Sequence, residues 1–597
     1  MYFCILMDKK WFLHPAVDKN LIKDLSEQLN ISEALAGLLA QRGVKNYEEA
    51  RCFFKPSLED IHDPFLMKDM EKGVERVEQA IANEEKVLIF GDYDVDGTTA
   101  VALMYSFLKD FISAIEYYVP DRYEEGYGIS TQSVEYAKTN GFTLMIVLDC
   151  GIKGHAEIAL AKQYGIDTIV CDHHLPDVVL PDAYAILDPK QIDCPYPYKE
   201  LSGCGVGFKL VQAIAQKRNI PFVELGKYFD LLVISIASDI VPITGENRVF
   251  AYFGLKLMNK RPRPGIESLL AFSKIVRKKQ PELPPLNTVF SREITINDLV
   301  FYVGPRINAA GRMATGRSAV HLLITNTVER IAELGEQVDT HNSERRELDL
   351  KSTNEAIDMV SAELDLEKKK SIVVYNPLWS KGIIGIVASR LVEHFYKPSI
   401  VLTLSNELIT GSARSVKGFD LHLALTQCSD LLEHFGGHTF AAGLALKPEN
   451  LDKFIEKFEQ VVSNSISEMA TTPTIEIDSL ISLDEISMEF FNVVKRFAPF
   501  GPENMSPVFM TKNVLDTGNI RIVGDNHVKM SLFQTNNRSY PVDAIAFGMG
   551  EHYRRILQGK PFHICYHINL NEWLGKSSLQ LTIKDIKYDF DEKDTVD

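Results

Sequence analysis

A run of carboxylates directly behind a short apolar segment places the strongest constraint on what this chain can fold into. The apolar segment Lys86-Val-Leu-Ile-Phe90 reads as a strand, and Gly91-Asp-Tyr-Asp-Val-Asp-Gly97 follows it at once. Three carboxylates at alternate positions repel one another unless a cation lies among them. The run therefore predicts a cation site at the end of a strand.

The same spacing of carboxylates also fits the opening of a calcium-binding EF-hand loop. The twelfth position of that loop would be Leu103, where the EF-hand requires a glutamate, and a strand precedes the run in place of a helix. The EF-hand interpretation is therefore excluded. We interpret Gly97-Thr98-Thr99 as the turn into a helix that runs through Leu108, with a threonine able to cap it.

Short apolar runs alternate with helical stretches after Lys86, and this alternation predicts the fold class. It indicates an α/β fold with a parallel sheet and helices on both faces, in which ligands gather beyond the carboxyl ends of the strands. The predicted strands are Val87–Phe90, Tyr117–Val119, Leu144–Leu148, Thr168–Cys171 and Ala183–Leu187.

The rest of the chain divides by its pattern of apolar residues and turn signals. Residues 1–84 read as helical, residues 85–327 as the first α/β domain, and residues 328–366 as a long linking helix. A second, smaller α/β domain is expected over residues 367–465. Short β-type runs with turn signals then predict a small β-barrel or sandwich over residues 466–597.

Composition limits the class of protein. The net charge of −17 argues against a protein that coats nucleic acid or anionic membrane over its whole surface, although local grooves can still be basic. The eight cysteines are scattered without a C-x-x-C pair, which disfavours a zinc ribbon or a disulfide framework. No run approaches the roughly 18 apolar residues of a membrane helix. We therefore expect a cytoplasmic protein that does not contact membranes.

Further carboxylates and histidines follow the other apolar runs. Asp149 follows one predicted strand, Asp172-His173-His174 follow the next, and a further apolar run, also expected to be a strand, ends at Asp239. A single Asp in this position is usually a helix cap, and a single His-His pair is usually structural. Their joint occurrence at one sheet edge, together with Asp94 and Asp96, predicts a metal site.

The type of ligand indicates which metal this site would hold. Oxygen-rich ligation with one or two imidazoles and no thiolate favours manganese or magnesium over zinc. With Asp149 between two ions about 3.5–4 Å apart, the expected chemistry is an in-line displacement at phosphorus by an activated water. The sequence therefore predicts a phosphoester hydrolase.

These motifs resemble a known family. The Asp172-His173-His174 triplet and the Gly91–Gly97 run resemble the DHH phosphoesterase superfamily, and within it the RecJ-type single-strand-specific exonucleases. The resemblance covers nearly the whole chain. It also rests, in this order, on Val119-Pro-Asp-Arg122, Glu125-Gly-Tyr-Gly128, Ala237-Ser-Asp239-Ile-Val-Pro242, Gly304-Pro-Arg-Ile-Asn-Ala-Ala-Gly-Arg312, Gly411-Ser-Ala-Arg-Ser415 and Gly436-Gly-His438.

The resemblance implies an architecture and a metal centre. It implies a parallel-sheet DHH domain, a long helix, a smaller α/β DHH-associated domain and a C-terminal barrel of the OB type that binds nucleic acid. Asp92 and His174 stay open between direct ligands and groups that orient a ligand. The residues implied as ligands of two Mn²⁺ or Mg²⁺ ions are Asp94, Asp96, Asp149, His173 and Asp239.

The resemblance also implies residues that contact the substrate. Gly437 and His438 would lie near the scissile phosphate in a domain that closes over the substrate; the alternative for His438 is a glycine-turn histidine without a role. Arginine forks suit phosphates, and structural ion pairing is the competing explanation for each arginine. The candidates for holding the DNA backbone and a terminal 5′ phosphate are Arg122, Arg306 and Arg414, with Asn308, Arg312 and Ser412 beside them.

The function that follows is a 5′-to-3′ exonuclease that releases 5′-mononucleotides from single-stranded DNA in repair and recombination. A helicase or a single-strand-binding protein is the implied class of protein partner. Two alternatives stay open. One is a DHH-family hydrolase of short oligonucleotides or cyclic dinucleotides, and the other is a non-catalytic replication scaffold. One departure from the family pattern is Leu187-Asp188-Pro189, where the family has Asn before the proline.

Overall fold

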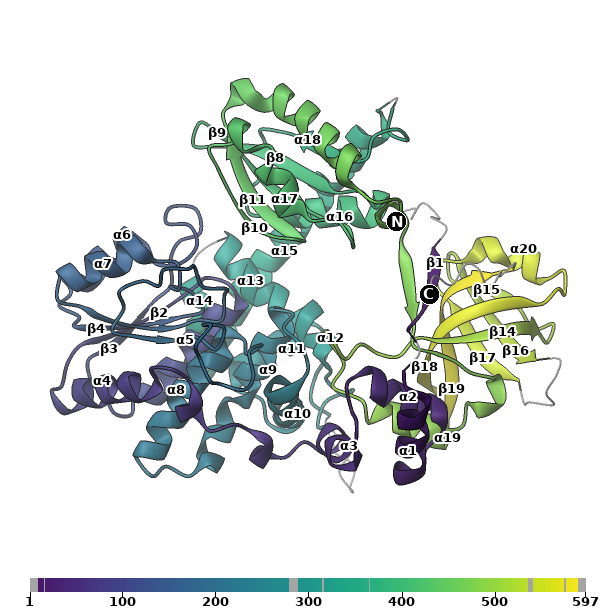
Figure 1. Cartoon of the computed structure of the whole chain (residues 1–597), viewed down its shortest axis with the longest axis horizontal. Coiled ribbons are helices and arrows are strands. Elements are labelled where there is room, and N and C mark those ends of the chain that lie inside the picture. The colour runs from purple at the N-terminus through teal and green to yellow at the C-terminus, as the bar shows by residue number, and fades with distance from the viewer. Residues whose placement is uncertain are drawn as a thin grey trace. The chain divides into compact units, whose positions relative to one another are not determined.

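The computed structural model describes residues 9–15, 17–278, 288–313, 316–363, 365–534, 541–573 and 576–588. The chain forms two compact units. One unit comprises residues 46–343 and 496–506, and the other comprises residues 1–45, 344–495 and 507–597. Each unit has its own sheets (Figure 1) and its own hydrophobic cores.

The first unit is built on a five-stranded parallel sheet in the order β3-β2-β4-β5-β6. The predicted fold class is confirmed, and each of the five predicted strands is present within two residues of its expected ends. The chain passes from β2 outward to β3 and then returns to the other side of β2, so the strand order reverses between β2 and β4. Ligand sites in open α/β sheets lie at such a reversal. The strands are β2 (Val87–Gly91), β3 (Ile115–Tyr118), β4 (Leu144–Leu148), β5 (Asp167–Cys171) and β6 (Ala185–Leu187).

Helices cover both faces of this sheet because successive strand residues point to opposite sides. Ile89 and Ile146 pack with the helices α4 (Met70–Ala82), α5 (Val95–Leu108) and α8 (Gly203–Lys217). Phe90 and Met145 pack on the opposite face with α6 (Thr131–Thr139) and α7 (His155–Gln163). The two strands that carry the carboxylates are therefore fixed from both sides.

A helical layer extends the same core beyond α8. It holds α9 (Phe229–Ser238) and α10 (Gly245–Lys260), followed by α11 (Pro264–Phe272) and a π-helical turn at Leu299–Val303. The unit also contains α3 (Tyr47–Phe54), α12 (Ile296–Asp298), α13 (Gly304–Met313) and α14 (Gly316–Ile324). The long helix α15 (Val328–Ser361) begins in this unit and continues into the other. The expected link over residues 328–366 is thus mainly helix, with Leu364 outside the described residues.

The second unit contains a mixed five-stranded sheet in the order β10-β11-β9-β8-β7. Only β7 and β8 run parallel, and the other pairs are antiparallel. The strands are β7 (Ile372–Tyr375), β8 (Ser399–Ser405), β9 (Leu408–Arg414), β10 (His434–His438) and β11 (Ala441–Leu446). The helices packed on this sheet are α16 (Ile384–Phe395), α17 (Leu421–Thr426) and α18 (Leu451–Ser465).

The β-rich region of the second unit is a closed barrel, as predicted (Figure 1, yellow strands). Closure comes from the pairings β14–β18, β18–β19, β19–β17, β17–β16 and β16–β14. Its strands are β14 (Phe509–Asp516), β16 (His527–Gln534), β17 (Val542–Ala546), β18 (Phe562–Trp573) and β19 (Lys576–Lys587). Smaller elements of the same region are β13 (Ser479–Leu480), α19 (Met488–Lys495), β15 (Arg521–Val523) and α20 (Tyr553–Ile556).

The N-terminal region contains the helices α1 (Lys19–Leu29) and α2 (Glu33–Gln41), together with a strand that the sequence did not predict. Strand β1 (Lys10–Leu13) pairs in parallel with β12 (Thr474–Ile477), far away in the sequence. Its Trp11 is fully buried and donates a hydrogen bond from Nε1 to Asp585. In the described part of the chain, no helix is both long enough and apolar enough to span a membrane.

Candidate active site

The carboxylate run forms the junction between β2 and α5. Helix α5 begins at Val95, before the turn that the sequence suggested at Gly97–Thr99, because Asp94 caps it: Oδ1 accepts a hydrogen bond from the amide of Gly97 at 3.0 Å. The expected threonine cap is wrong, since Thr99 donates to the carbonyl of Val95 within the helix. A Cβ at Gly97 would lie 2.4 Å from the carbonyl oxygen of Asp92, so only glycine fits there.

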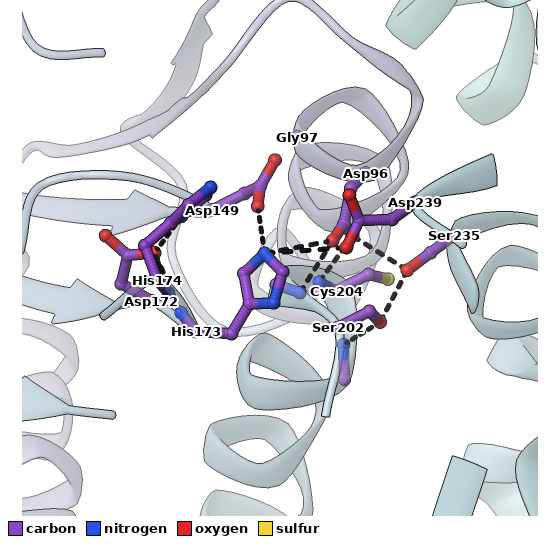
Figure 2. Close-up of polar contacts among 12 residues, drawn as sticks. Asp96, Gly97, Asp149, Asp172, His173, His174, Ser202, Cys204, Ser235 and Asp239 are labelled. Carbon is purple, nitrogen blue, oxygen red and sulfur yellow. Dashed lines mark hydrogen bonds and ion pairs between the residues drawn. The ribbon is translucent and has the colours of Figure 1, made fainter. Parts of the chain in front are cut away.

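The carboxylate of Asp96 is held by donors from two other helices (Figure 2). The amides of Gly203 and Cys204 at the start of α8 donate to Oδ2 and Oδ1 at 2.7 and 2.8 Å, and the hydroxyl of Ser235 donates to Oδ1 at 2.7 Å. A helix N-terminus presents free amides and positive potential to an anion. These three donors fix the orientation of the Asp96 carboxylate, which is 1% exposed.

The imidazole of His173 faces three carboxylates (Figure 2). Its Nε2 lies 3.1 Å from Asp149, 3.6 Å from Asp239 and 3.8 Å from Asp96. Both ring nitrogens are buried, and neither has a hydrogen-bond partner among the described residues. Buried polar atoms are nearly always satisfied, so an acceptor nitrogen surrounded by carboxylates is the arrangement expected of metal ligands.

His174 is held differently from His173. Its Nδ1 lies 2.7 Å from Oδ1 of Asp172, and this carboxylate oxygen also accepts from the amides of His173 and His174. Burial opposes the charged imidazolium, but the hydrogen bond to Asp172 outweighs it and raises the pKa of His174 to about 9. Conversely, although burial favours protonated Asp172, the same pair lowers the pKa of Asp172 to about 2. His174 therefore carries a positive charge at neutral pH in the metal-free site.

The remaining carboxylates are crowded, with Asp92 and Asp149 buried and Asp94 and Asp239 half-buried. Burial first, and neighbouring carboxylates second, raise the pKa of Asp92, Asp149 and Asp239 well above the ordinary value. The pKa of Asp94 is raised for the same two reasons. Asp92 accepts a hydrogen bond from Gly128 at 3.3 Å through Oδ1, while its Oδ2 has no partner within the described residues. The cluster is thus unfavourable when ionised and gains most from a bound cation.

Two overlapping groups of side chains bring their ligand atoms within 4.8 Å of one another. One group is Asp149, His173 and His174, and the other is Asp96, His173 and Asp239. Asp92 and Asp94 belong to neither group. Their pKa values are nevertheless raised, as are those of Asp149 and Asp239. The donors are carboxylate oxygens and imidazole nitrogens, which fits Mn²⁺ or Mg²⁺.

The segment before Asp239 is not the strand that the sequence suggested. Phe229–Ser238 is the helix α9, buried along almost its whole length, and Asp239 is its C-cap residue. A continuous apolar run cannot by itself distinguish a buried strand from a buried helix. The expectation of four strand ends is therefore corrected to three strand ends and one helix end.

The candidate substrate residues of the first unit lie in different environments. Arg122 stacks over the ring of Tyr93 at 4.6 Å and has no ion pair among the described residues. Arg306 is 8% exposed and donates to Asp339 and to the carbonyl of Tyr302, both at 2.8 Å. These contacts favour the structural explanation for Arg306. Asn308 and Arg312 are half-buried on α13, which also carries Gly311 against the backbone of Tyr93.

The other candidates belong to the second unit. Arg414 on β9 donates through Nη1 to Ser412 Oγ at 3.0 Å and to the carbonyl of Ala413 at 2.8 Å. A Cβ at Gly385, in the first turn of α16, would lie 3.0 Å from both side chains. Burial lowers the pKa of Arg414, and no described carboxylate offsets this. Gly437 and His438 are exposed on the edge strand β10.

Several residues of the site were not predicted from the sequence. Ser235 lies within an apolar run, and Tyr127 and Gly128 lie in a motif that carried no assigned chemistry. Gly203 and Cys204 had one available signal, the glycine-rich start of a helix in Ser202-Gly-Cys-Gly-Val-Gly207, which is typical of close backbone approach.

Comparisons with known proteins identify the family to which the chain is similar. Family models match the chain as "DHH family, N-terminal domain" over residues 86–236, "DHHA1 domain" over 368–464 and "RecJ OB domain" over 477–585. The single-stranded-DNA-specific exonuclease RecJ of Bacillus subtilis is 37% identical over 573 residues, covering 95% of this chain and 70% of that protein. RecJ of Escherichia coli is 30% identical, with 92% and 95% covered.

Solved structures show the same fold. The crystal structure of Thermus thermophilus RecJ in complex with Mn²⁺ matches 98% of this chain and 80% of that chain, with a TM-score of 0.81 and 21% identity. An exonuclease RecJ bound to manganese matches 68% of this chain and 96% of that chain, with a TM-score of 0.56 and 26% identity. The resemblance read from the motifs is confirmed: the chain belongs to the RecJ family of single-stranded-DNA-specific exonucleases.

Proposed function

We propose that this protein degrades single-stranded DNA from its 5′ end by phosphodiester hydrolysis at a centre that holds two Mn²⁺ or Mg²⁺ ions. The observation that carries the proposal is Nε2 of His173, which is buried, lacks a hydrogen-bond partner within the described chain, and faces Asp96, Asp149 and Asp239. The relatives and the solved RecJ structures with Mn²⁺ and Mg²⁺ support the same chemistry.

The donor set fits these ions. The residues that would hold them are Asp94, Asp96, Asp149, His173 and Asp239, with Asp92 close by. When bound, two such ions supply charge for the scissile phosphate and lower the pKa of a water that attacks it. Relief of the like-charge crowding among the buried carboxylates would contribute to the binding free energy of the cations.

The protein's own residues supply the remaining tasks. His174, positively charged through its contact with Asp172, offers a donor to a phosphate oxygen at the edge of the site. Asp96, fixed by three donors, keeps its carboxylate in one orientation as substrate enters. Arg122, stacked on Tyr93, presents a guanidinium for the DNA backbone.

We assign recognition of the 5′-terminal phosphate to Arg414, Ser412 and the first turn of α16. Three features support this assignment: a half-buried guanidinium without a described carboxylate partner, a hydroxyl beside it, and a close approach of Gly385 at a helix N-terminus. A terminal phosphate would neutralise Arg414 and give the enzyme its 5′ polarity. His438 and Gly437, exposed on β10, remain candidates for contact with the scissile phosphate.

The test uses a 5′-phosphorylated single-stranded oligonucleotide labelled at its 3′ end, with Mn²⁺ present. We expect 3′-labelled products that shorten stepwise, no cleavage of the matching duplex, and loss of activity in Asp149→Asn. Asp182→Asn is the matched control because Asp182 is an exposed acid paired with Lys162. Shortening from the 3′ end, unimpaired Asp149→Asn, or preference for a dinucleotide over the long strand would each overturn the proposal.

The requirement for a single-stranded substrate also bears on the protein partners of the enzyme and on its location in the cell. Because the substrate has to be single-stranded, we infer that a helicase or a single-strand-binding protein presents it, in the cytoplasm. Adding a single-strand-binding protein to the reaction should then change the degradation rate of long strands more than that of short ones. An equal effect on both lengths would count against such a partner.

A further inference from the structure

The loop between β3 and α6 carries Arg122, and a second part of it, Tyr127 and Gly128, contacts the carboxylate cluster. A single carboxylate ties its two ends together. Oε1 of Glu125 accepts from the hydroxyl of Tyr118 at 3.0 Å and from the amide of Asp121 at 2.8 Å, while Oε2 accepts from the hydroxyl of Ser130, the N-cap residue of α6. The loop is thus anchored to the last residue of β3 and to the start of α6.

This anchored loop presents Tyr127 and Gly128 to the carboxylate cluster. Gly128 donates its amide to Asp92. The hydroxyl of Tyr127 donates to the main-chain oxygen of Asp149 at 3.1 Å and lies 3.2 Å from Nε2 and 3.4 Å from Nδ1 of His174. Because Tyr127 is 56% exposed, its hydroxyl contacts fix its position more than packing of its ring does.

The backbone of Asp149 requires such support. Its φ is +60°, in the left-handed region that residues other than glycine adopt infrequently and at a cost in free energy. On one side, the amide of Asp149 donates to the carbonyl of Cys171 at 2.9 Å. On the other side, the hydroxyl of Tyr127 holds its carbonyl. Both peptide groups that flank Asp149 are therefore fixed.

We propose that Tyr127 is a positioning residue of the active site: its hydroxyl holds Asp149 in the left-handed conformation and sets the orientation of the His174 imidazole. The inference rests on the proposed role of Asp149 as a metal ligand. One hydroxyl thereby links the backbone of a proposed carboxylate ligand to the imidazole of His174, as groups behind metal ligands set the orientation of those ligands.

The test compares Tyr127→Phe with Tyr118→Phe. Both changes remove one hydroxyl from the same loop region, but among the described residues that of Tyr118 donates to Glu125 and not to the carboxylate cluster. Binding of Mn²⁺ is measured by titration calorimetry without DNA, and thermal unfolding is followed in EDTA. We expect the affinity for Mn²⁺ to fall about tenfold in Tyr127→Phe, as is typical when a residue that orients a metal ligand is changed. In Tyr118→Phe the affinity should stay within about twofold of wild type.

Kinetics supply the second measurement. In Tyr127→Phe, kcat should fall at moderate Mn²⁺ and recover in part at high Mn²⁺, with the KM for DNA unchanged. Wild-type affinity for Mn²⁺ in Tyr127→Phe, or equal losses in both variants, would overturn the assignment to Tyr127 while leaving the metal centre intact. Absence of Mn²⁺ binding in the wild-type protein would instead overturn the proposed function together with this inference.

Discussion

A Cβ atom on Gly203 would lie 2.5 Å from Oδ1 of Asp149. The amide of the same glycine donates to Asp96, so one backbone position at the start of α8 touches two proposed ligands. An alanine there would have to displace Asp149, whose backbone is already left-handed and buried. The absence of a side chain at Gly203 is thus a condition for the geometry of the centre.

The first prediction follows from this contact. Gly203→Ala should lower kcat by about 10²-fold, because a displacement on the order of 1 Å of a catalytic group costs that much. Gly226→Ala is the control, since a Cβ at Gly226 meets nothing within 4 Å. Steady-state kinetics and circular dichroism check the outcome. Equal activity of the two variants would show that Asp149 tolerates the displacement.

The second prediction concerns stability without metal. The folded-state pKa of Asp149 is raised by burial and then by neighbouring carboxylates. An acid with a raised folded pKa stabilises the fold at pH values below its unfolded pKa, and this contribution is lost as pH rises through the folded pKa. In EDTA, Asp149→Asn should therefore gain in Tm over wild type on going from about pH 4, near the unfolded pKa of an aspartate, to about pH 8.

With Mn²⁺ present at the higher pH, the Tm of the wild-type protein should exceed that of Asp149→Asn, the reverse of the order in EDTA. Saturation at about 100 times Kd stabilises a protein by about 2.7 kcal/mol, and the variant that lacks a ligand gains less. Differential scanning calorimetry with EDTA and with Mn²⁺ checks both parts. A Tm difference between the two proteins that is the same at both pH values would contradict the role of like-charge crowding.

The parallel sheet and the barrel were predictable because each strand is a short apolar run bounded by turn signals, and every residue of β4 is buried as its sequence implies. Helix α9 was not predictable because its apolar run has no polar face. Strand β1 was missed because its partner β12 lies more than 450 residues away in the sequence. Pairing at that distance leaves no local signal.

The candidate site divides along similar lines. Asp149 and His173 were predictable because polar residues directly after buried strands have to meet at one edge of a parallel sheet. The donors to Asp96 were not, since amides carry no side-chain signature. The explanation of Arg306 as an ion-paired residue was open from the sequence, and only its contact with Asp339 favours it. Partner choice by a single arginine depends on tertiary packing.

The third prediction concerns the one departure from the family pattern. Asp188 is fully buried, and its Oδ2 has no hydrogen-bond partner in the described part of the chain. Burial raises the pKa of Asp188 to about 7, and the nearby charge of Asp172 adds to this. As for Asp149, the folded pKa is higher than the unfolded pKa. The stability that protonated Asp188 contributes is therefore lost as pH rises through about 7.

Asp188→Asn restores the residue that the family pattern has before the proline. It should stabilise the protein more at about pH 8 than at about pH 5.5, by on the order of 2 kcal/mol, because about 1.5 pH units separate pH 5.5 from the folded pKa of about 7. Chemical denaturation at the two pH values measures this difference. Asp193→Asn is a suitable control because Asp193 is exposed and paired with Lys68. Stabilisation of equal size at both pH values would mean that Asp188→Asn acts through a new hydrogen bond and not by removing a buried charge.

The fourth prediction concerns the 5′ end of the substrate. If Arg414 binds the terminal phosphate as a bidentate fork, Arg414→Lys should keep the charge but lose the geometry. The preference for a 5′-phosphorylated strand over a 5′-hydroxyl strand, measured as a ratio of kcat/KM, should then fall about tenfold or more, because hydrogen bonds to charged groups contribute about 1.5–3 kcal/mol.

Arg390→Lys is the matched control for this experiment. Arg390 lies on α16 in the same sheet-and-helix region, and its guanidinium is already paired with Asp349 at 3.3 Å. Its replacement should leave the preference for the 5′ phosphate unchanged. Gly385→Ala should resemble Arg414→Lys, because its Cβ would press on Nη2 of Arg414 and on Oγ of Ser412. An unchanged preference in both Arg414→Lys and Gly385→Ala would place recognition of the terminal phosphate elsewhere in the chain.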